Sequence, residues 1–102
     1  MTQAEFNPVI ADGIVVVDFF AERCKPCKMI APYLEQMQEK LAWHVNFYKV
    51  DVDEENELAG SQGITAMPTL KIFKDGQEVK TIVGADLESV WNGIQNELKI
   101  KN

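Results

Sequence analysis

The amino-acid sequence predicts an α/β protein with a central mixed β-sheet that is flanked by helices on both faces. Three observations support this fold class. The apolar run IVVVDFF at residues 14–20 is typical of a strand that is buried on both faces. Apolar residues at helical spacing follow it, and two later β-rich runs flank an Asp-Gly turn. The predicted order of strand, helix, strand, helix, hairpin and helix indicates a mixed sheet between two helical layers.

Three further elements are predicted in the first half of the chain. Residues 3–11 favour a short helix, and residues 26–41 favour a longer one. Pro26 suits the first turn of this second helix, whereas Pro32 lies inside it and is expected to kink it. The alternating segment VNFYKVDV at residues 45–52 predicts a second strand.

The second half of the chain predicts a short helix, a hairpin and a last helix. The segment DEENEL at 53–58 resembles a helix start more than a calcium loop, because it lacks the glycine of an EF-hand turn. Residues 69–83 predict the hairpin. Asp86 is a candidate cap for the last helix, in which Gly93 costs about 1 kcal/mol relative to alanine. The apolar stripe of this helix consists of Leu87, Val90, Trp91, Ile94 and Leu98.

Length and composition predict one domain that spans residues 1–102. The chain is 46% hydrophobic and 25% charged, as in ordinary globular proteins, and its net charge of −6 argues against binding to nucleic acid or anionic membranes. No apolar stretch approaches the roughly 20 residues of a membrane span. The first residues lack the pattern of a secretory signal, so we expect a cytoplasmic protein.

The only two cysteines, Cys24 and Cys27, stand in the segment RCKPC directly after the first strand. A disulfide between them would close a very short loop, which gives only about 2 kcal/mol and makes a poor structural staple. Zinc needs four ligands, and the chain offers only His44 besides the cysteines, so a metal site would require carboxylates or a second chain. Reversible redox chemistry is the favoured interpretation.

The position of the pair suits thiol–disulfide exchange. Cys24 is expected at the start of a helix, where free N–H groups and the helix dipole stabilise a thiolate that can attack a substrate disulfide. Cys27 lies one turn later and can resolve the mixed disulfide. The positive charges of Arg23 and Lys25 are expected to stabilise the thiolate further, which raises the redox potential.

Three other residues have both a functional and a structural interpretation. Asp18 lies within the buried strand, so burial is expected to raise its pKa, and it is either a proton acceptor for Cys27 through a water molecule or a paired structural aspartate. Lys49 is either its charge partner or a solvent-facing lysine. Pro68 opens a strand, and about 5% of such X-Pro bonds are cis.

Together these features resemble the thioredoxin family. The matching stretches are VVVDFFAERCKPCKMIAP, FYKVDVDEEN, GITAMPTLKIFKDGQEV and VGAD, and they cover nearly the whole chain from about residue 4. The resemblance implies a thioredoxin-like fold and an enzyme that reduces protein disulfides through a dithiol–disulfide cycle. The family sheet has five strands, but this chain begins almost at the first helix, so four to five strands are expected.

The resemblance also implies a role for each site residue. Cys24 is the nucleophile, Cys27 the resolving thiol, Asp18 the buried proton acceptor, Lys49 its neighbour and Pro68 a cis proline that faces the cysteines. The backbone of Met67 is expected to pair with an extended substrate. The expected substrate-binding residues are Arg23, Lys25, Pro26, Val52, Ala66, Met67, Val83, Gly84 and Ala85.

The implied partners are disulfide-containing protein substrates and an electron donor. We expect a monomer with no bound cofactor and no metal, reduced by an NADPH-dependent flavoprotein thioredoxin reductase or another thiol donor. Arg23 and Lys25 replace the family's usual Trp and Gly, and Phe20 replaces another frequent Trp. The alternatives are a more oxidising, isomerase-like protein, a non-catalytic thioredoxin-like binding module and a dimer that holds a metal cluster.

Overall fold

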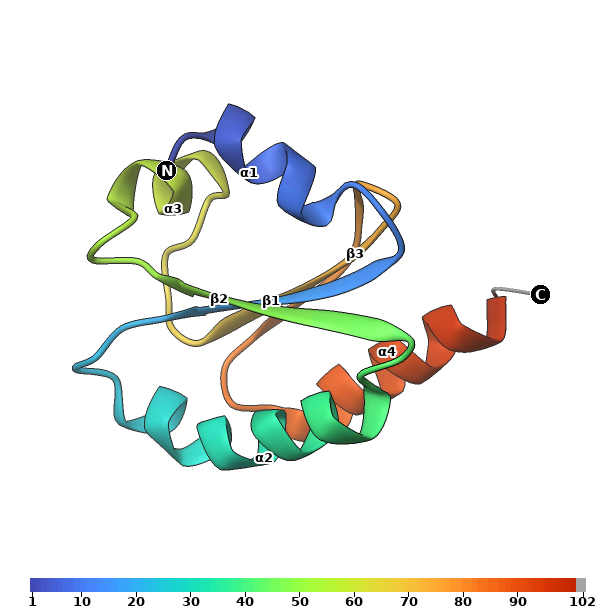
Figure 1. The fold of residues 1–102 in the computed structure, drawn as a ribbon. Helices are drawn as coiled ribbons and strands as arrows, with labels where there is room; N and C mark the ends of the chain where they lie inside the picture. Colours follow the sequence, from blue (N-terminus) through green and yellow to red (C-terminus); the bar gives the residue numbers. More distant parts are fainter. Residues whose placement is uncertain (101–102) are drawn as a thin grey trace.

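The structure, a computed structural model, describes residues 1–100, without the side chain of Ile100. It confirms the predicted α/β class and the order of the elements (Figure 1). The elements are α1 (Gln3–Ile10), β1 (Ile14–Phe20), α2 (Lys25–Leu41), β2 (Val45–Asp51), α3 (Asn56–Ser61), β3 (Thr69–Lys74), β4 (Gln77–Val83) and α4 (Leu87–Ile100).

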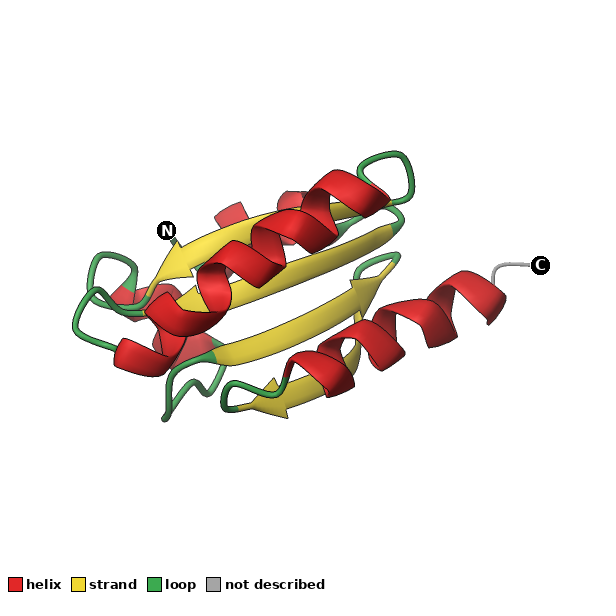
Figure 2. Ribbon diagram, turned by 90° about the horizontal axis from the view of Figure 1, so that it is seen from below, coloured by secondary structure: helices red, strands yellow, loops and turns green. Residues whose placement is uncertain are grey.

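The sheet contains four strands within the described residues, in the order β2-β1-β3-β4. Strand β1 runs parallel to β2 and antiparallel to β3, which pairs antiparallel with β4. Helices α1 and α3 cover one face of the sheet, and α2 and α4 cover the other (Figures 1 and 2). The mixed sheet between two helical layers is therefore confirmed. Of the four to five strands expected, the described residues form four.

Strand β1 contributes to a separate apolar core on each face of the sheet. Its odd-numbered residues, such as Val17, pack with Phe6 of α1 under the α1/α3 layer. Its even-numbered residues, such as Val16, pack with Ile30 of α2 and Ile94 of α4. Because successive side chains of a strand point to opposite faces, a strand in the middle of a three-layer fold must be apolar throughout. Asp18 interrupts this rule on the α2 face.

The segment between β2 and α3 differs from the sequence prediction. A helix was expected at 53–58, but α3 begins only at Asn56. The Asp51 carboxylate accepts the backbone N–H of Asp53 at 2.9 Å, and the acidic residues form a turn before the helix. Short aspartate side chains compete in this way for backbone donors, which favours turns over helix interiors.

Local signals placed the hairpin and the start of α4 correctly. Asp75 and Gly76 both have positive φ, 50° and 88°, as a two-residue hairpin turn requires. The Asp86 carboxylate accepts the backbone N–H of Ser89 at 3.1 Å and caps α4. Gly93 has a role that the sequence did not reveal. A Cβ atom at this position would lie 2.7 Å from Cδ1 of the buried Ile72, so the glycine allows α4 to approach β3 closely.

Candidate active site

Cys24 and Cys27 are joined by a disulfide at the start of α2, and their Cα atoms are 5.3 Å apart. Cys24 is the N-cap residue of the helix, and its sulfur accepts the backbone N–H of Cys27 at 3.1 Å. Cys24 is half-buried, whereas only 4% of Cys27 is exposed. A helix start supplies unpaired N–H groups and a favourable dipole for negative charge, so the more accessible sulfur is also the one placed to carry it.

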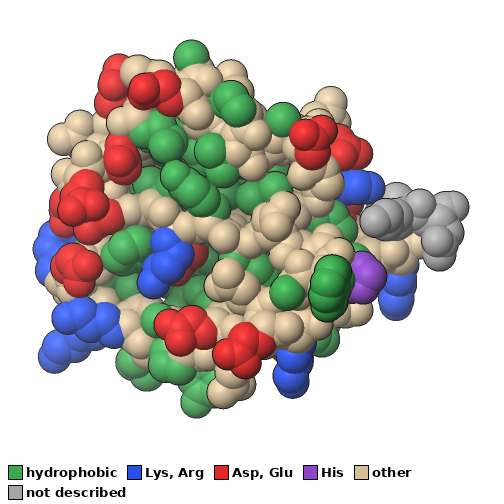
Figure 3. All heavy atoms as spheres, viewed as in Figure 1, with side chains coloured by type: hydrophobic (Ala, Val, Ile, Leu, Met, Phe, Trp, Pro, Cys, Tyr) green, Lys and Arg blue, Asp and Glu red, His purple; other side chains and the backbone are tan. Residues whose placement is uncertain are grey.

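The two positive charges beside Cys24 have different surroundings. The Arg23 guanidinium forms an ion pair with Asp53 at 3.2 Å, and both side chains are exposed. Among residues 1–100 no ion pair involves Lys25. Figure 3 shows acidic and basic side chains next to each other at the end of the molecule where β1 leads into α2. Asp53 is thirty residues from Arg23 in the sequence, so only the fold brings this counter-charge to the active-site segment.

Asp18 is a buried carboxylic acid close to the dithiol. It is 5% exposed, and its Oδ1 atom has no hydrogen-bond partner. Burial raises the pKa of Asp18 from its ordinary value of 3.8 to about 6, and the positive charge of Lys49 opposes this rise. A carboxyl group with this pKa can take up and release a proton near neutral pH.

Lys49 lies directly opposite Asp18 in the parallel pair of β1 and β2. Its ammonium group lies 4.7 Å from the centre of the Phe20 ring, which is the geometry of a cation–π contact. The described side chains form no ion pair between Lys49 and Asp18. Lys49 and Asp18 therefore form no direct salt bridge. The positive charge of Lys49 instead lowers the pKa of Asp18 through space.

A cavity of about 160 Å³ connects Asp18 with the buried cysteine. Its polar and apolar lining residues are Asp18, Phe20, Ala21, Glu22, Cys27, Lys28, Ala31 and Lys49. A water molecule occupies about 30 Å³ in the liquid and needs polar partners, and both conditions are met here. The cavity thus offers room for a water bridge between the Asp18 carboxyl group and the Cys27 sulfur.

The chain order of the strands brings a second segment to the active-site edge of the sheet. Thr69, the first residue of β3, pairs with Phe19 near the end of β1 and with Val83 at the end of β4. The residues just before β3 and just after β4 therefore meet beside the segment that carries the cysteines. The Met67–Pro68 bond is cis, the form that the resemblance implies.

Hydrogen bonds fix the segments next to β3 and β4 that carry several of the expected substrate-binding residues. The backbone N–H of Gly84 donates to the Pro68 carbonyl at 2.8 Å, and Gly84 has a φ of 101° that favours glycine. The Thr69 hydroxyl donates to the Ala66 carbonyl at 2.7 Å. Val83, Ala66, Ala85, Arg23, Lys25 and Pro26 are exposed, and Met67 and Gly84 are half-buried.

Val52 differs from the other expected substrate-binding residues. Its side chain is 8% exposed and packs in the core under α1 and α3. Its backbone N–H donates to the Phe20 carbonyl at 2.9 Å and fixes the chain beside the end of β1. Val52 therefore supports this edge of the molecule more than it lines an open surface.

A buried strand that leads into a helix-start dithiol, next to a buried carboxylic acid and a cis proline, defines a thiol–disulfide oxidoreductase of the α/β class. The chain belongs to the thioredoxin family, whose pattern matches residues 1–96. It is 47% identical to thioredoxin-1 of Saccharomyces cerevisiae over 94 residues, which are 91% of this chain and 90% of that protein. It is 48% identical to thioredoxin 1 of Plasmodium falciparum over 86 residues, 83% of this chain and 82% of the relative.

Solved structures support the same assignment. The oxidised form of mitochondrial thioredoxin 3 from S. cerevisiae has a TM-score of 0.87 and 38% identity, with 93% of this chain and 90% of that chain covered. A structure of P. falciparum thioredoxin has a TM-score of 0.84 and 43% identity, with 93% of each chain covered. The protein is thus a thiol–disulfide oxidoreductase, and Cys24 and Cys27 form its redox-active pair.

Family membership also bears on cofactors. Thioredoxins work without a bound cofactor, and residues 1–100 contain no group of three or more His, Cys, Asp or Glu side chains that could hold a metal ion. None of the described helices is both long and apolar enough to cross a membrane.

Proposed function

We propose that this protein reduces disulfides in protein substrates, with Cys24 as the nucleophile and Cys27 as the resolving thiol. The observation that carries the assignment is the difference between the two sulfurs. Cys24 is the accessible N-cap residue and accepts a backbone N–H, whereas Cys27 is buried one turn later.

The first step forms a mixed disulfide. The Cys24 thiolate attacks one sulfur of the substrate disulfide, the substrate S–S bond breaks, and its other sulfur leaves as a thiolate that takes up a proton. The helix start lowers the free energy of the attacking thiolate, because the backbone N–H of Cys27 donates to its sulfur and the helix dipole favours negative charge there.

The second step releases the reduced substrate. Cys27 transfers its proton through a water molecule in the cavity to the Asp18 carboxylate and then attacks the Cys24 sulfur. The second substrate sulfur leaves as a thiolate, and the protein is left with the Cys24–Cys27 disulfide. Two electrons have then passed from the protein to the substrate. Lys49 tunes the proton affinity of Asp18 through space.

The substrate is held in extended form at the active-site edge of the sheet. The Met67 backbone, half-buried before β3, pairs with the substrate main chain beside the disulfide. The neighbouring surface of Ala66, Val83, Gly84 and Ala85, with Arg23, Lys25 and Pro26, contacts the substrate side chains.

The Cys24–Cys27 disulfide is then reduced back to the dithiol by an NADPH-dependent flavoprotein thioredoxin reductase or another thiol donor. The protein acts as a monomer in the cytoplasm. Its thioredoxin family membership and the absence of a resident cofactor in that family support an external electron donor.

The test is coupled turnover with insulin, NADPH and a purified thioredoxin reductase. We expect insulin reduction with stoichiometric NADPH oxidation, and no turnover for the double variant Cys24→Ser, Cys27→Ser. Turnover with dithiothreitol but not with the reductase would contradict the flavoprotein donor and favour another thiol donor. No insulin reduction with either donor would contradict the proposed function.

A further inference from the structure

Lys71 is a buried lysine of β3 that the chemistry of the dithiol does not use. The residue is 7% exposed. It points to the face of the sheet that α1 and α3 cover, the same face as Thr69 and Phe73, because alternate residues of a strand share a face. A buried ammonium group is costly unless it is paired and hydrogen-bonded, so its partners indicate what it holds in place.

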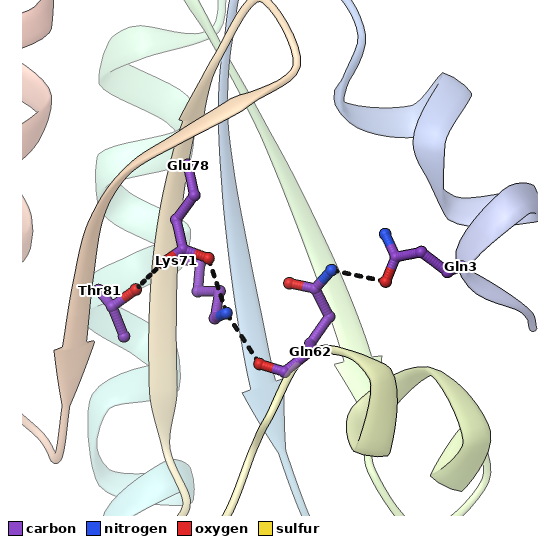
Figure 4. Close-up of polar contacts among 5 residues, drawn as sticks. All are labelled: Gln3, Gln62, Lys71, Glu78 and Thr81. Carbon is purple, nitrogen blue, oxygen red and sulfur yellow. Dashed lines mark hydrogen bonds and ion pairs between the residues drawn. The ribbon is translucent and has the colours of Figure 1, made fainter.

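The Lys71 ammonium group joins the hairpin to the main chain of another segment (Figure 4). It donates to Glu78 Oε1 of β4 at 2.7 Å and to the Gln62 carbonyl at 2.9 Å. The other oxygen of Glu78 accepts the Thr81 hydroxyl at 2.7 Å, which fixes the carboxylate. The hydrogen bond from Lys71 holds the pKa of Glu78 below its ordinary value, so the Glu78 carboxylate stays ionised near neutral pH.

Gln62 stands where α3 ends and the segment 62–68 begins, which leads to Met67 and Pro68. Two side chains from the same face of β3 hold this segment. Lys71 binds the carbonyl at its start, and the Thr69 hydroxyl binds the Ala66 carbonyl near its end.

The side chain of Gln62 connects the same point to α1. Its amide donates to Gln3 Oε1 at 2.8 Å (Figure 4). The start of the segment is therefore held from the hairpin by its main chain and from α1 by its side chain. Through Lys71 and Gln62, the described contacts thus join β3, β4, α1 and the end of α3.

We propose that Lys71 is a positioning residue that holds the segment 62–68 in place, so that the Met67 backbone lies in register for an extended protein substrate. The inference rests on the proposed pairing of Met67 with substrate. It makes the Lys71–Glu78 pair a determinant of how well the protein binds polypeptide disulfides, as opposed to small disulfides that need no main-chain pairing.

The experiment compares Lys71→Met with Lys74→Met, a matched control in the same strand whose side chain makes no hydrogen bond within residues 1–100. For Lys71→Met we expect the KM for insulin to rise about three- to ten-fold, the effect of losing one well-formed hydrogen bond, with little change in kcat. The rate with the small disulfide dithiobis(nitrobenzoic acid) should stay within about two-fold of wild type. Lys74→Met should change neither.

Amide hydrogen exchange supplies a second measurement that does not depend on turnover. The N–H groups of Gly63 and Ile64 bond to carbonyls of Gly60 and Ala59, and they should exchange faster in Lys71→Met, while β1 stays protected. Glu78→Gln keeps the lysine and replaces Lys71→Met in the experiment if that variant does not fold. It should raise the KM for insulin and the exchange rates of Gly63 and Ile64 by smaller amounts than Lys71→Met.

Two outcomes would overturn the proposal. One is an unchanged KM for insulin with unchanged exchange at Gly63 and Ile64. The other is an equal loss of rate with insulin and with the small disulfide, because that pattern indicates damage to the dithiol or to the whole fold. A wild-type protein that failed to reduce insulin would refute the proposed function, and the exchange rates would then decide the role of Lys71.

Discussion

Lys49 lies directly opposite Asp18 in the parallel pair of β1 and β2, yet its ammonium group contacts the Phe20 ring and the Asp18 Oδ1 atom has no hydrogen-bond partner. The carboxyl group is therefore buried with incomplete compensation, and burial raises its pKa to about 6. Such a group lowers the stability of the fold, and groups of this kind cluster at functional sites. This agrees with a role of Asp18 in proton transfer.

The first prediction concerns the stability of Asp18→Asn. Asp18 binds its proton more tightly in the folded state, and between about pH 4 and pH 6 only the unfolded chain prefers the charged form. Folding is therefore penalised increasingly as pH rises through this range, and the penalty is complete above about pH 6. The full penalty corresponds to about 3 kcal/mol. In urea titrations the variant should be more stable than wild type at pH 8 by up to this amount and nearly equal to it below pH 4.

The same variant should slow the resolving step, because Cys27 loses its proton acceptor. Stopped-flow measurements with insulin should show a mixed disulfide that accumulates above pH 6. Lys49→Met is the companion variant and should raise the pKa of Asp18 further. An Asp18→Asn protein that is less stable than wild type and turns over normally would favour a purely structural aspartate.

The second prediction separates the two cysteines. Cys24→Ser should abolish reduction, because the accessible nucleophile is lost. Cys27→Ser should retain the first step and trap a stable mixed disulfide with substrates. Mass spectrometry of the trapped adducts checks this, and equal trapping by both variants would contradict the assignment of roles.

The third prediction concerns the charges beside Cys24. A nearby cation stabilises the thiolate and hence the reduced protein, so Lys25→Gln should lower the midpoint potential by about 10 to 25 mV in a glutathione redox buffer. Arg23→Gln should lower it less, because Asp53 already offsets the guanidinium. Asp53→Asn should raise it. An equal shift for both cation variants would show that the ion pair has no influence on the sulfur.

The fourth prediction concerns Gly93. Alanine is favoured over glycine in a helix by about 1 kcal/mol, but overpacking against buried Ile72 costs about 1 to 3 kcal/mol. Gly93→Ala should therefore lower the free energy of unfolding by about 1 kcal/mol in urea titrations.

Two variants test this explanation. The loss should shrink in an Ile72→Val background, which removes the Cδ1 atom 2.7 Å away and leaves the new methyl group against Cδ of the exposed, flexible Lys80 side chain, 2.9 Å away. Gly60→Ala, in α3 with open space around it, is the matched control and should be neutral or stabilising. A Gly93→Ala variant that is more stable than wild type would contradict the prediction, because it would show that α4 moves away from β3 without loss of stability.

The sequence predicted the features that depend on neighbours along the chain. The apolar run 14–20, the Asp-Gly turn and the cap at Asp86 act locally, so strands, hairpin and last helix were placed correctly. The predicted start of α3 was wrong. The Asp51 carboxylate accepts the backbone N–H of Asp53 in a turn, and the helix begins only at Asn56.

The sequence by itself determined the chemistry of the pair, since Cys24 and Cys27 are three residues apart at a helix start, and any chain that forms this helix brings them together. Only the tertiary structure decided which charges act on it. The ion pair of Arg23 with Asp53 and the contact of Lys49 with Phe20 depend on how strands and loops pack. The contacts of Lys71, which lie apart from the dithiol, depend on the same packing. The physical reason is that local periodicity fixes which face a side chain takes, whereas its partner depends on distances between segments far apart in the chain.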